Sequence, residues 1–279
     1  MAPVYFKNVP SEIITSNQNP KVKFLNKLCL KSSFRKEQGL FIVEGKREVK
    51  RAVKSGYQLE AIFYCPEVGH SKDLELQSEL KIDAEKIIYI SQSIFENLAY
   101  REFFDGVIAL FKSQTRKLED LKLSKNPLII VVETVEKPGN LGAIFRTADA
   151  AKVDAIIVCD PKTDLYNPNV IRASVGCLFS VPFATGSGEE VFDWIKGKKI
   201  NLYGAALSAE EVYSSRDYTG PTAIVVGSEA DGLSEFWLKN STQIKIPMQG
   251  IADSLNVSVS TAVIIFEAVR QRRLSKNNG

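Results

Sequence analysis

Short apolar runs alternate with segments of helical periodicity along most of the chain, and this alternation limits the possible folds most strongly. A short apolar run between turn residues predicts a strand, and apolar residues at every third or fourth position predict a helix. Strand–helix alternation is typical of the α/β class with largely parallel sheets. The clearest expected helices cover 46–55 and 142–151. The expected strands cover 40–43, 61–64, 86–90, 107–111, 128–133, 155–159, 201–206, 222–227 and 243–247.

A polar, charged segment at 112–126 interrupts this alternation. The chain has 279 residues, which exceeds the roughly 150 residues usual for one domain. We therefore predict a first domain at 1–115, a linker at 116–127 and a second domain at 128–279.

The absence of long apolar runs bears on where the protein works. No run approaches the roughly 20 apolar residues that a membrane-spanning helix requires. The first ten residues lack the basic start and apolar core of a secretory signal. We expect a cytoplasmic protein with no membrane partner.

The usage of histidine and cysteine excludes several kinds of catalytic site. The chain has one histidine, His70, and no G-x-S-x-G elbow, which disfavours a Ser-His-Asp hydrolase. The four cysteines form no C-x-x-C pair, and we expect reduced, mostly buried thiols at Cys29, Cys65, Cys159 and Cys177. A histidine-rich metal site is excluded, we predict no metal, and any reaction must proceed without imidazole.

Positive charge is concentrated in the first part of the chain. Residues 1–125 hold 21 Lys or Arg and 16 Asp or Glu, whereas 126–279 hold 15 and 17. The stretch 21–54 has 11 basic residues and three acidic ones, which suits the phosphate backbone of a nucleic acid. The alternative is an ordinary solvated helix surface. The residues expected to contact RNA are Arg35, Lys36, Lys46, Arg47 and Lys50.

Three predicted strands of the second part end in loops rich in small or polar residues, and ligands of open α/β sheets bind at the carboxyl ends of strands. The first loop enters a helix through Pro138, Gly139 and Asn140. Arg146 lies off the apolar stripe of that helix. The alternative makes Asn140 a helix N-cap and Arg146 a solvated side chain.

The second and third loops carry further polar residues. The second, at 227–232, holds Ser228 and Glu229, and it matches neither a phosphate-binding loop nor a dinucleotide fingerprint. Taken alone, it is equally typical of a simple turn. The third loop brings Ser254 and Asn256 to the start of a long expected helix, where both residues are also good helix caps.

Together, the three segments closely resemble the motifs of the SpoU/TrmH family of RNA ribose methyltransferases. The family pattern is approximately P-G-N-x-G-x-x-x-R-T-A, then G-x-E-x-x-G-L, then I-P-M-x-G followed by S-L-N-V-S-x-A. All three motifs occur here in the family's order and spacing, and the resemblance covers about 128–273. The matching segments are PGNLG at 138–142, RTA at 146–148, GSE at 227–229, GL at 232–233, IPM at 246–248 and SLNVS at 254–258.

The resemblance implies a fold, a cofactor and a set of site residues. The second domain is expected to be an α/β domain with a deep trefoil knot, to bind S-adenosylmethionine and to form a homodimer with the RNA site across its interface. Arg146 corresponds to the catalytic arginine of the family. The polar residues that shape the same site are Asn140, Glu229, Ser254 and Asn256. The expected cofactor contacts are Gly227, Ser228, Ile246, Met248 and Leu255.

The first domain resembles the smaller, ribosomal-protein-like α/β domain with which rRNA-modifying members of the family recognise RNA. This likeness rests on 34–56. It implies 2′-O-methylation of rRNA in preference to tRNA. The alternatives are a tRNA 2′-O-methyltransferase and a non-catalytic RNA-binding or ribosome-assembly protein of the same fold.

Overall fold

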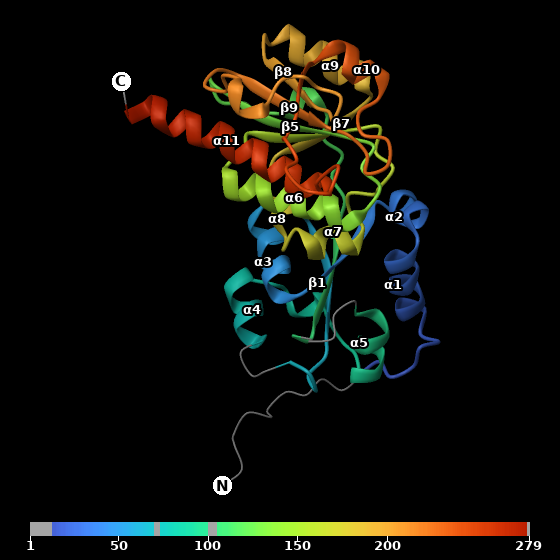
Figure 1. Cartoon of the computed structure of the whole chain (residues 1–279). Coiled ribbons are helices and arrows are strands. Elements are labelled where there is room, and N and C mark those ends of the chain that lie inside the picture. Colours follow the sequence, from blue (N-terminus) through green and yellow to red (C-terminus); the bar gives the residue numbers. More distant parts are fainter. Residues whose placement is uncertain (1–12, 70–72, 100–104, 278–279) are drawn as a thin grey trace. The chain divides into compact units, whose positions relative to one another are not determined.

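The computed structural model describes residues 13–69, 73–99 and 105–277 (Figure 1). The chain forms two compact units, and neither is a single continuous stretch of sequence. The first unit combines Met1–Gln114 with Tyr166–Phe179, and the second combines Thr115–Leu165 with Ser180–Gly279. The units differ from the predicted ranges mainly in Tyr166–Phe179, and the predicted domain boundaries stay a prediction.

The first unit contains a four-stranded mixed sheet in the order β1-β4-β2-β3. Strand β4 lies between β1 and β2 and runs antiparallel to both, and only β2 and β3 pair in parallel. The expectation of largely parallel pairing was therefore wrong for this sheet, because the last strand inserts between two earlier ones in the opposite direction. The strands are β1 (Leu40–Glu44), β2 (Leu59–Tyr64), β3 (Ile87–Tyr89) and β4 (Val107–Lys112).

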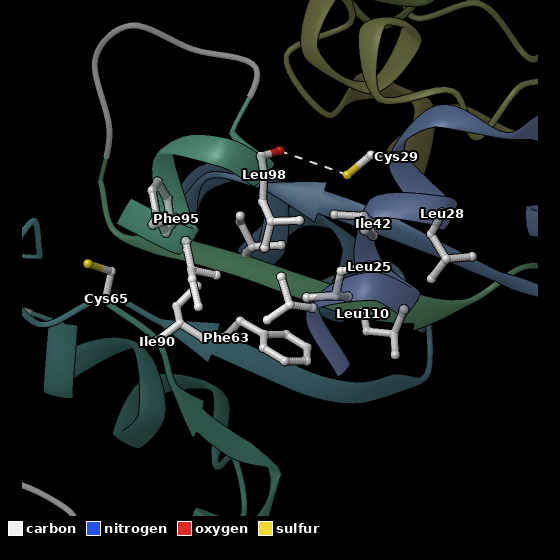
Figure 2. Packing of buried hydrophobic residues seen from close by; sticks show 13 residues of the cluster. Leu25, Leu28, Cys29, Ile42, Phe63, Cys65, Ile90, Phe95, Leu98 and Leu110 are labelled. Atoms are coloured by element: carbon white, nitrogen blue, oxygen red, sulfur yellow. Dashed lines mark hydrogen bonds between the residues drawn. The ribbon is translucent and has the colours of Figure 1, made fainter. Parts of the chain in front are cut away.

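A core of buried aliphatic and aromatic side chains joins helix α1 to this sheet. Leu25 and Leu28 of α1 pack in one cluster with Ile42, Phe63 and Leu110 of the strands (Figure 2). Burying such side chains is the main favourable contribution to folding. The helices of this unit are α1 (Pro20–Leu30), α2 (Ser32–Gln38), α3 (Lys46–Lys54), α4 (Asp73–Leu80), α5 (Gln92–Leu98) and α7 (Pro168–Ala173), with a short 3-10 turn η1 (Ala84–Lys86).

The second unit contains a six-stranded sheet in the order β10-β8-β9-β5-β6-β7. All of its strands pair in parallel, so the predicted α/β class with a parallel sheet is confirmed here. Strand β7 was missed from the sequence because it is short and lies between Pro182 and a Gly-Ser-Gly turn. The strands are β5 (Leu128–Glu133), β6 (Ala155–Cys159), β7 (Phe183–Gly186), β8 (Asn201–Ala205), β9 (Thr222–Val226) and β10 (Thr242–Ile244).

Helices cover both faces of this sheet. Figure 1 shows α6 and α11 together on one face, with α9 and α10 on the other. Alternate residues such as Ile129 and Val131 of β5 pack with Val191 of α9 and Trp237 of α10, because successive strand residues point to opposite faces. The helices of this unit are α6 (Pro138–Ala151), α9 (Gly188–Gly197), α10 (Glu235–Asn240) and α11 (Val257–Asn277), with 3-10 turns η2 (Leu118–Asp120) and η3 (Tyr213–Ser215). Three of the four residues of α8 (Cys177–Ser180) belong to the first unit.

Helix α6 begins four residues earlier than the sequence predicted. Pro138 occupies its first turn, a position where the fixed φ of proline and its missing N–H are favourable. Asn140 therefore lies inside the first turn, and the alternative in which it caps the helix is wrong. The trefoil knot stays a prediction. Among the described residues, no helix has both the length and the apolarity needed to cross a membrane.

Candidate functional site

The predicted site lies where the topology of the parallel sheet changes direction. From β5 the chain proceeds to β6 and β7 on one side, and from β9 it proceeds to β10, beyond β8, on the other. Strands β5 and β9 are neighbours, so the loops that follow them leave their carboxyl ends in opposite directions. Such a switch point is where open α/β sheets bind ligands. The loops after β5 and β9 carry two of the predicted motifs.

The carboxylate of Glu229 joins the loop after β9 to the start of α6. It accepts hydrogen bonds from Asn140 Nδ2 at 2.6 Å and from the backbone N–H groups of Glu136 at 3.1 Å and Lys137 at 3.2 Å. Partial burial alone would raise the pKa of Glu229, but these hydrogen bonds outweigh it and hold the pKa below its ordinary value. The carboxylate is thus ionised at the positive end of a helix dipole.

Asn140 and Asn256 extend this set to the start of α11. Asn256 Nδ2 donates to Asn140 Oδ1 at 3.0 Å, and Asn256 Oδ1 accepts from the backbone N–H of Ser258 at 2.9 Å and from its hydroxyl at 2.6 Å. Asn256 therefore caps α11 and, at the same time, contacts α6. We call the three hydrogen-bonded residues Glu229, Asn140 and Asn256 the polar triad.

The loop after β9 is closed on itself. Ser228 and Gly232 exchange two backbone hydrogen bonds, of 2.9 and 3.2 Å, and the hydroxyl of Ser228 accepts from the N–H of Asp231 at 3.0 Å. A Cβ atom on Gly227 would lie 2.0 Å from the carbonyl oxygen of Gly232, so only glycine fits there. This closure directs the carboxylate of Glu229 toward α6.

A cleft of about 760 Å³ opens beside the polar triad. Eight of the predicted residues line it, namely Gly227, Ser228, Glu229, Ile246, Met248, Ser254, Leu255 and Asn256. Sequence reasoning missed another part of the wall, Ala205, Ala206, Leu207 and Ser208, which follows β8. The rule that ligands bind at carboxyl strand ends applies to β8 as well and would have indicated these residues.

The composition of the cleft suits a ligand with an aromatic base and a positive charge. Leu238, Ile244 and Ile264 contribute apolar wall. Asp231 and Asp253 add carboxylates to that of Glu229. Ligand pockets of this size are usually apolar with a few placed polar groups, so the residues fit S-adenosylmethionine, whose sulfonium is cationic.

Among the described residues, no hydrogen bond joins Arg146 or Ser254 to the polar triad. Arg146 is exposed on α6, and it does not line the cleft. Ser254 lines the cleft and is exposed, and its hydroxyl donates to Asp253 Oδ1 at 3.3 Å. The structure therefore brings Asn140, Glu229 and Asn256 together and leaves the side chain of Arg146 free to meet another molecule.

The predicted RNA contacts of the first unit differ in their surroundings. Arg35 is 3% exposed, and its guanidinium donates to the carbonyl oxygens of Leu28 and Cys29. The prediction that Arg35 contacts RNA is therefore wrong, because the side chain is buried between α1 and α2. Lys36 and Arg47 are exposed, whereas Lys46 and Lys50 are partly exposed.

Thiols and metal ligands give no second candidate site among the described residues. The four cysteines are buried thiols outside any disulfide, and burial raises the pKa of Cys29 to about 12 and that of Cys65 to about 11. Within the described ranges, no group of three or more His, Cys, Asp or Glu side chains is placed to hold a metal ion. His70 lies outside the described residues.

Comparison with known proteins identifies relatives of both units. Residues 127–266 match the SpoU rRNA Methylase family, and 19–109 match the MRM3-like substrate binding domain. The 23S rRNA (uridine(2479)-2′-O)-methyltransferase of Streptomyces viridochromogenes is 32% identical over 247 residues, with 85% of each chain covered.

Two solved structures of RNA methyltransferases are similar in fold to this chain. A crystal structure of an RNA 2′-O ribose methyltransferase is 40% identical and covers 94% of this chain and all of its own, with a TM-score of 0.82. An AdoMet-bound rRNA methyltransferase from Sinorhizobium meliloti is 26% identical and covers 93% of this chain and 97% of its own, with a TM-score of 0.84.

Proposed function

This chain belongs to the SpoU rRNA methylase family, and on that premise we propose how its cleft methylates RNA. The protein is an S-adenosylmethionine-dependent 2′-O-methyltransferase that acts on the ribose of rRNA. The observation that carries the assignment to this cleft is the polar triad, which joins three motif loops beside it. An RNA-binding protein without activity would have no use for a cofactor cleft.

The loops around the cleft hold the cofactor when it binds. Gly227 and Ser228 present backbone groups, while Ile246, Met248 and Leu255 supply apolar wall. The cofactor supplies an electrophilic methyl group on a sulfonium. Asp231 and Asp253 line the same cleft, and their carboxylates would stabilise the positive charge of a bound sulfonium.

The protein then has to align the acceptor. A ribose 2′-hydroxyl must lie in line with the methyl group and the sulfur, and holding that geometry accounts for a large part of the rate. Arg146 binds the phosphate beside the acceptor ribose or stabilises negative charge on its 2′-oxygen. A guanidinium keeps its proton in proteins, so Arg146 is not a general base. The proton of the 2′-hydroxyl therefore passes to water, as the oxygen–methyl bond forms and the bond from the methyl group to the sulfur breaks. Asn140 and Asn256 hold the loops and the ribose, and Glu229 fixes the start of α6.

A second copy of the chain completes the site. Helix α11 exposes a stripe of large apolar side chains, with Val259 at 47%, Phe266 at 44% and Leu274 at 50% exposure. These side chains are seven and eight residues apart, a spacing that puts them on one helix face, and exposed apolar surface marks protein contact. We assign the stripe to a homodimer in which Arg146 of one copy serves the cleft of the other.

The substrate is rRNA, held by the first unit through its basic residues. Among the predicted contacts, Lys36, Lys46, Arg47 and Lys50 retain this role, and Arg35 does not. A tRNA substrate is the second candidate and lacks a comparable observation in its favour. The cytoplasmic location expected from the sequence stays a prediction. Mapping 2′-O-methyl sites in rRNA and tRNA, with and without the protein, identifies the substrate.

The decisive test of the mechanism is Arg146→Ala. Transfer of labelled methyl from S-adenosylmethionine to RNA should fall by at least about 100-fold, because the positively charged group at the acceptor is lost. Cofactor binding measured by calorimetry should stay within about threefold, since Arg146 is proposed to contact the RNA acceptor and not the cofactor. Arg273→Ala, at an exposed position of α11, is the control. Wild-type turnover in the Arg146 variant contradicts the proposal.

A further inference from the structure

One side of α1 carries two lysines and a third follows at its C-cap, whereas the opposite side of the helix is buried. Val22, Leu25 and Leu28 lie in the core of the first unit with no exposed surface. Lys23 and Lys27 of α1 and Lys31, the residue that caps the C-terminal end of α1, are all exposed and follow one another at four-residue intervals. We call Lys23, Lys27 and Lys31 the lysine stripe.

Mutual repulsion within the lysine stripe opposes the stability of α1, whereas Lys27, in the last turn, is favourably placed for the helix dipole. Like charges four residues apart repel one another, and the stripe contains two such pairs. Lys21 and Lys23 also lie in the first turn, which has no acidic residue and is the positive end of the helix dipole. An arrangement that is unfavourable in the free protein becomes favourable when a polyanion lies along the helix.

The cations of α3 have local partners that the lysine stripe lacks. Lys50 and Lys54 both pair with Glu79, and Arg47 pairs with Glu48 at 2.8 Å. Arg51 donates to the carbonyl oxygen of Val175 at 2.7 Å. Among the residues that the structure describes, none of the three stripe lysines forms an ion pair.

We propose that the lysine stripe of α1 is the main surface on which the first unit binds the phosphate backbone of the RNA substrate. The proposal rests on the proposed function, which makes RNA the substrate. The stripe spans about 12 Å along the helix axis, at 1.5 Å per residue, so it is long enough to follow several phosphates. Lys27 also lies over the ring of Phe34, 5.6 Å from its centroid, which fixes the α2 end of the surface.

The salt dependence of RNA affinity distinguishes this surface from the rest of the protein surface. A lysine that neutralises a phosphate releases counterions, and each such contact adds about 0.7 to 0.9 to the slope of log Kd against log salt concentration. Three contacts therefore contribute roughly 2 to 3 to that slope. A lysine that is only solvated contributes nothing.

The test compares two variants with the same change of charge. In the first, the three stripe lysines are replaced by glutamine (K23Q, K27Q and K31Q). In the matched control, three exposed lysines of the second unit are replaced in the same way (K122Q, K125Q and K198Q). Binding to protein-free 23S rRNA is measured from 50 to 300 mM KCl, together with methyl transfer and thermal unfolding.

We expect the stripe variant to lose at least tenfold in affinity near 150 mM KCl and about 2 in salt slope, with the control unchanged. The stripe variant should unfold at about the same temperature as the wild type, because the lost repulsion is offset by the lost attraction of Lys27 to the C-terminal end of the helix dipole. A third variant of α3 (R47Q, K50Q and K54Q) should lose less affinity than the stripe variant.

Two results would overturn the proposal. Unchanged affinity and slope in a folded stripe variant would show that the lysines are only solvated. The second result is a stripe variant that binds protein-free rRNA normally but no longer methylates assembled ribosomal particles. That result would assign the stripe to a protein partner instead. If the wild type binds RNA through the stripe but transfers no methyl group, the proposed function fails and this inference stands.

Discussion

At the scale of single residues, Glu229 has the largest number of consequences for the site. Its carboxylate accepts from Asn140, Glu136 and Lys137, so one side chain determines how two loops meet. Glu229→Gln replaces one carboxylate oxygen with an amide NH2 group, which cannot accept a hydrogen bond from an N–H group. We expect methyl transfer to fall about tenfold or more, since hydrogen bonds to charged groups are worth about 1.5 to 3 kcal/mol each. Single-turnover kinetics measure this change, and an unchanged rate would remove Glu229 from the site.

The same carboxylate gives the site a predictable response to acid. The pKa of Glu229 in the folded protein lies below its ordinary value, so the ionised form stabilises the native state above that ordinary value. This contribution is lost as the pH falls through the lowered pKa.

Gly227 allows a sharper test, because its environment excludes any side chain. In Gly227→Ala, the new Cβ would lie 2.0 Å from the carbonyl oxygen of Gly232, and the loop must move to admit it. Affinity for S-adenosylmethionine, measured by calorimetry, should fall at least about 30-fold, or roughly 2 kcal/mol. The matched control is Gly197→Ala, where nothing lies within 4 Å of the added atom. Equal affinities in the two variants would separate this loop from cofactor binding.

Residue identities were predictable from sequence only where a motif spacing was informative. The motifs indicated Asn140, Glu229 and Asn256, and the structure joins the three by hydrogen bonds. Arg35 was misjudged because a count of basic residues treats every arginine as surface charge. Its guanidinium instead donates to the carbonyl oxygens of Leu28 and Cys29 at the end of α1. No single-sequence pattern distinguishes these two uses of arginine.

At the scale of elements, the last part of α11 is fixed by one guanidinium. Arg272 donates to the carbonyl oxygens of Tyr218, Gly220, Asn126 and Pro127, at 2.7 to 2.9 Å. These carbonyl groups belong to the segments that precede β5 and β9, so Arg272 joins the C-terminal helix to the start of the central strands. Burial lowers the pKa of Arg272.

We expect Arg272→Met to lower the free energy of unfolding by about 2 to 4 kcal/mol, because several charge-assisted hydrogen bonds are lost together. Urea denaturation measures the loss. Arg273→Met removes the same charge from an exposed neighbour on the same helix and should change stability by less than about 0.5 kcal/mol. A similar effect of both substitutions would mean that charge alone, and not the carbonyl contacts, is responsible.

The strands and helices were predictable to different degrees, for a physical reason. Strands such as β5 and β9 are buried on both faces and appear as unbroken apolar runs. The pairing direction in the first sheet was not predictable, because β4 lies between β1 and β2 through contacts distant in sequence. The start of α6 at Pro138 depends on a carboxylate that follows it by 91 positions in the chain, which local periodicity does not contain.

At the scale of the whole molecule, the proposed homodimer depends on the exposed apolar stripe of α11. Phe266→Glu places a charge in the middle of that stripe, and burying an unpaired charge in an interface is costly. We expect dimers to dissociate at micromolar concentration, as measured by light scattering after size exclusion, with methyl transfer lost in parallel. Lys239→Glu, at an exposed position of α10, should leave the mass measured by light scattering at that of the dimer. A dimeric, active Phe266→Glu protein would refute the assignment of this face.

The path of the chain also limits how these proteins can be dissected or recombined. Tyr166–Phe179 belongs to the first unit although it is encoded within the second, and its Tyr166 ring stacks on Phe41 at 4.3 Å. A protease cut or a gene truncation near residue 114 would therefore expose the apolar side chains of Tyr166–Phe179 on the catalytic fragment. It would also leave a cavity in the N-terminal fragment, where these side chains pack. Chimeras that exchange recognition modules between relatives need to carry both stretches of sequence as a matched pair.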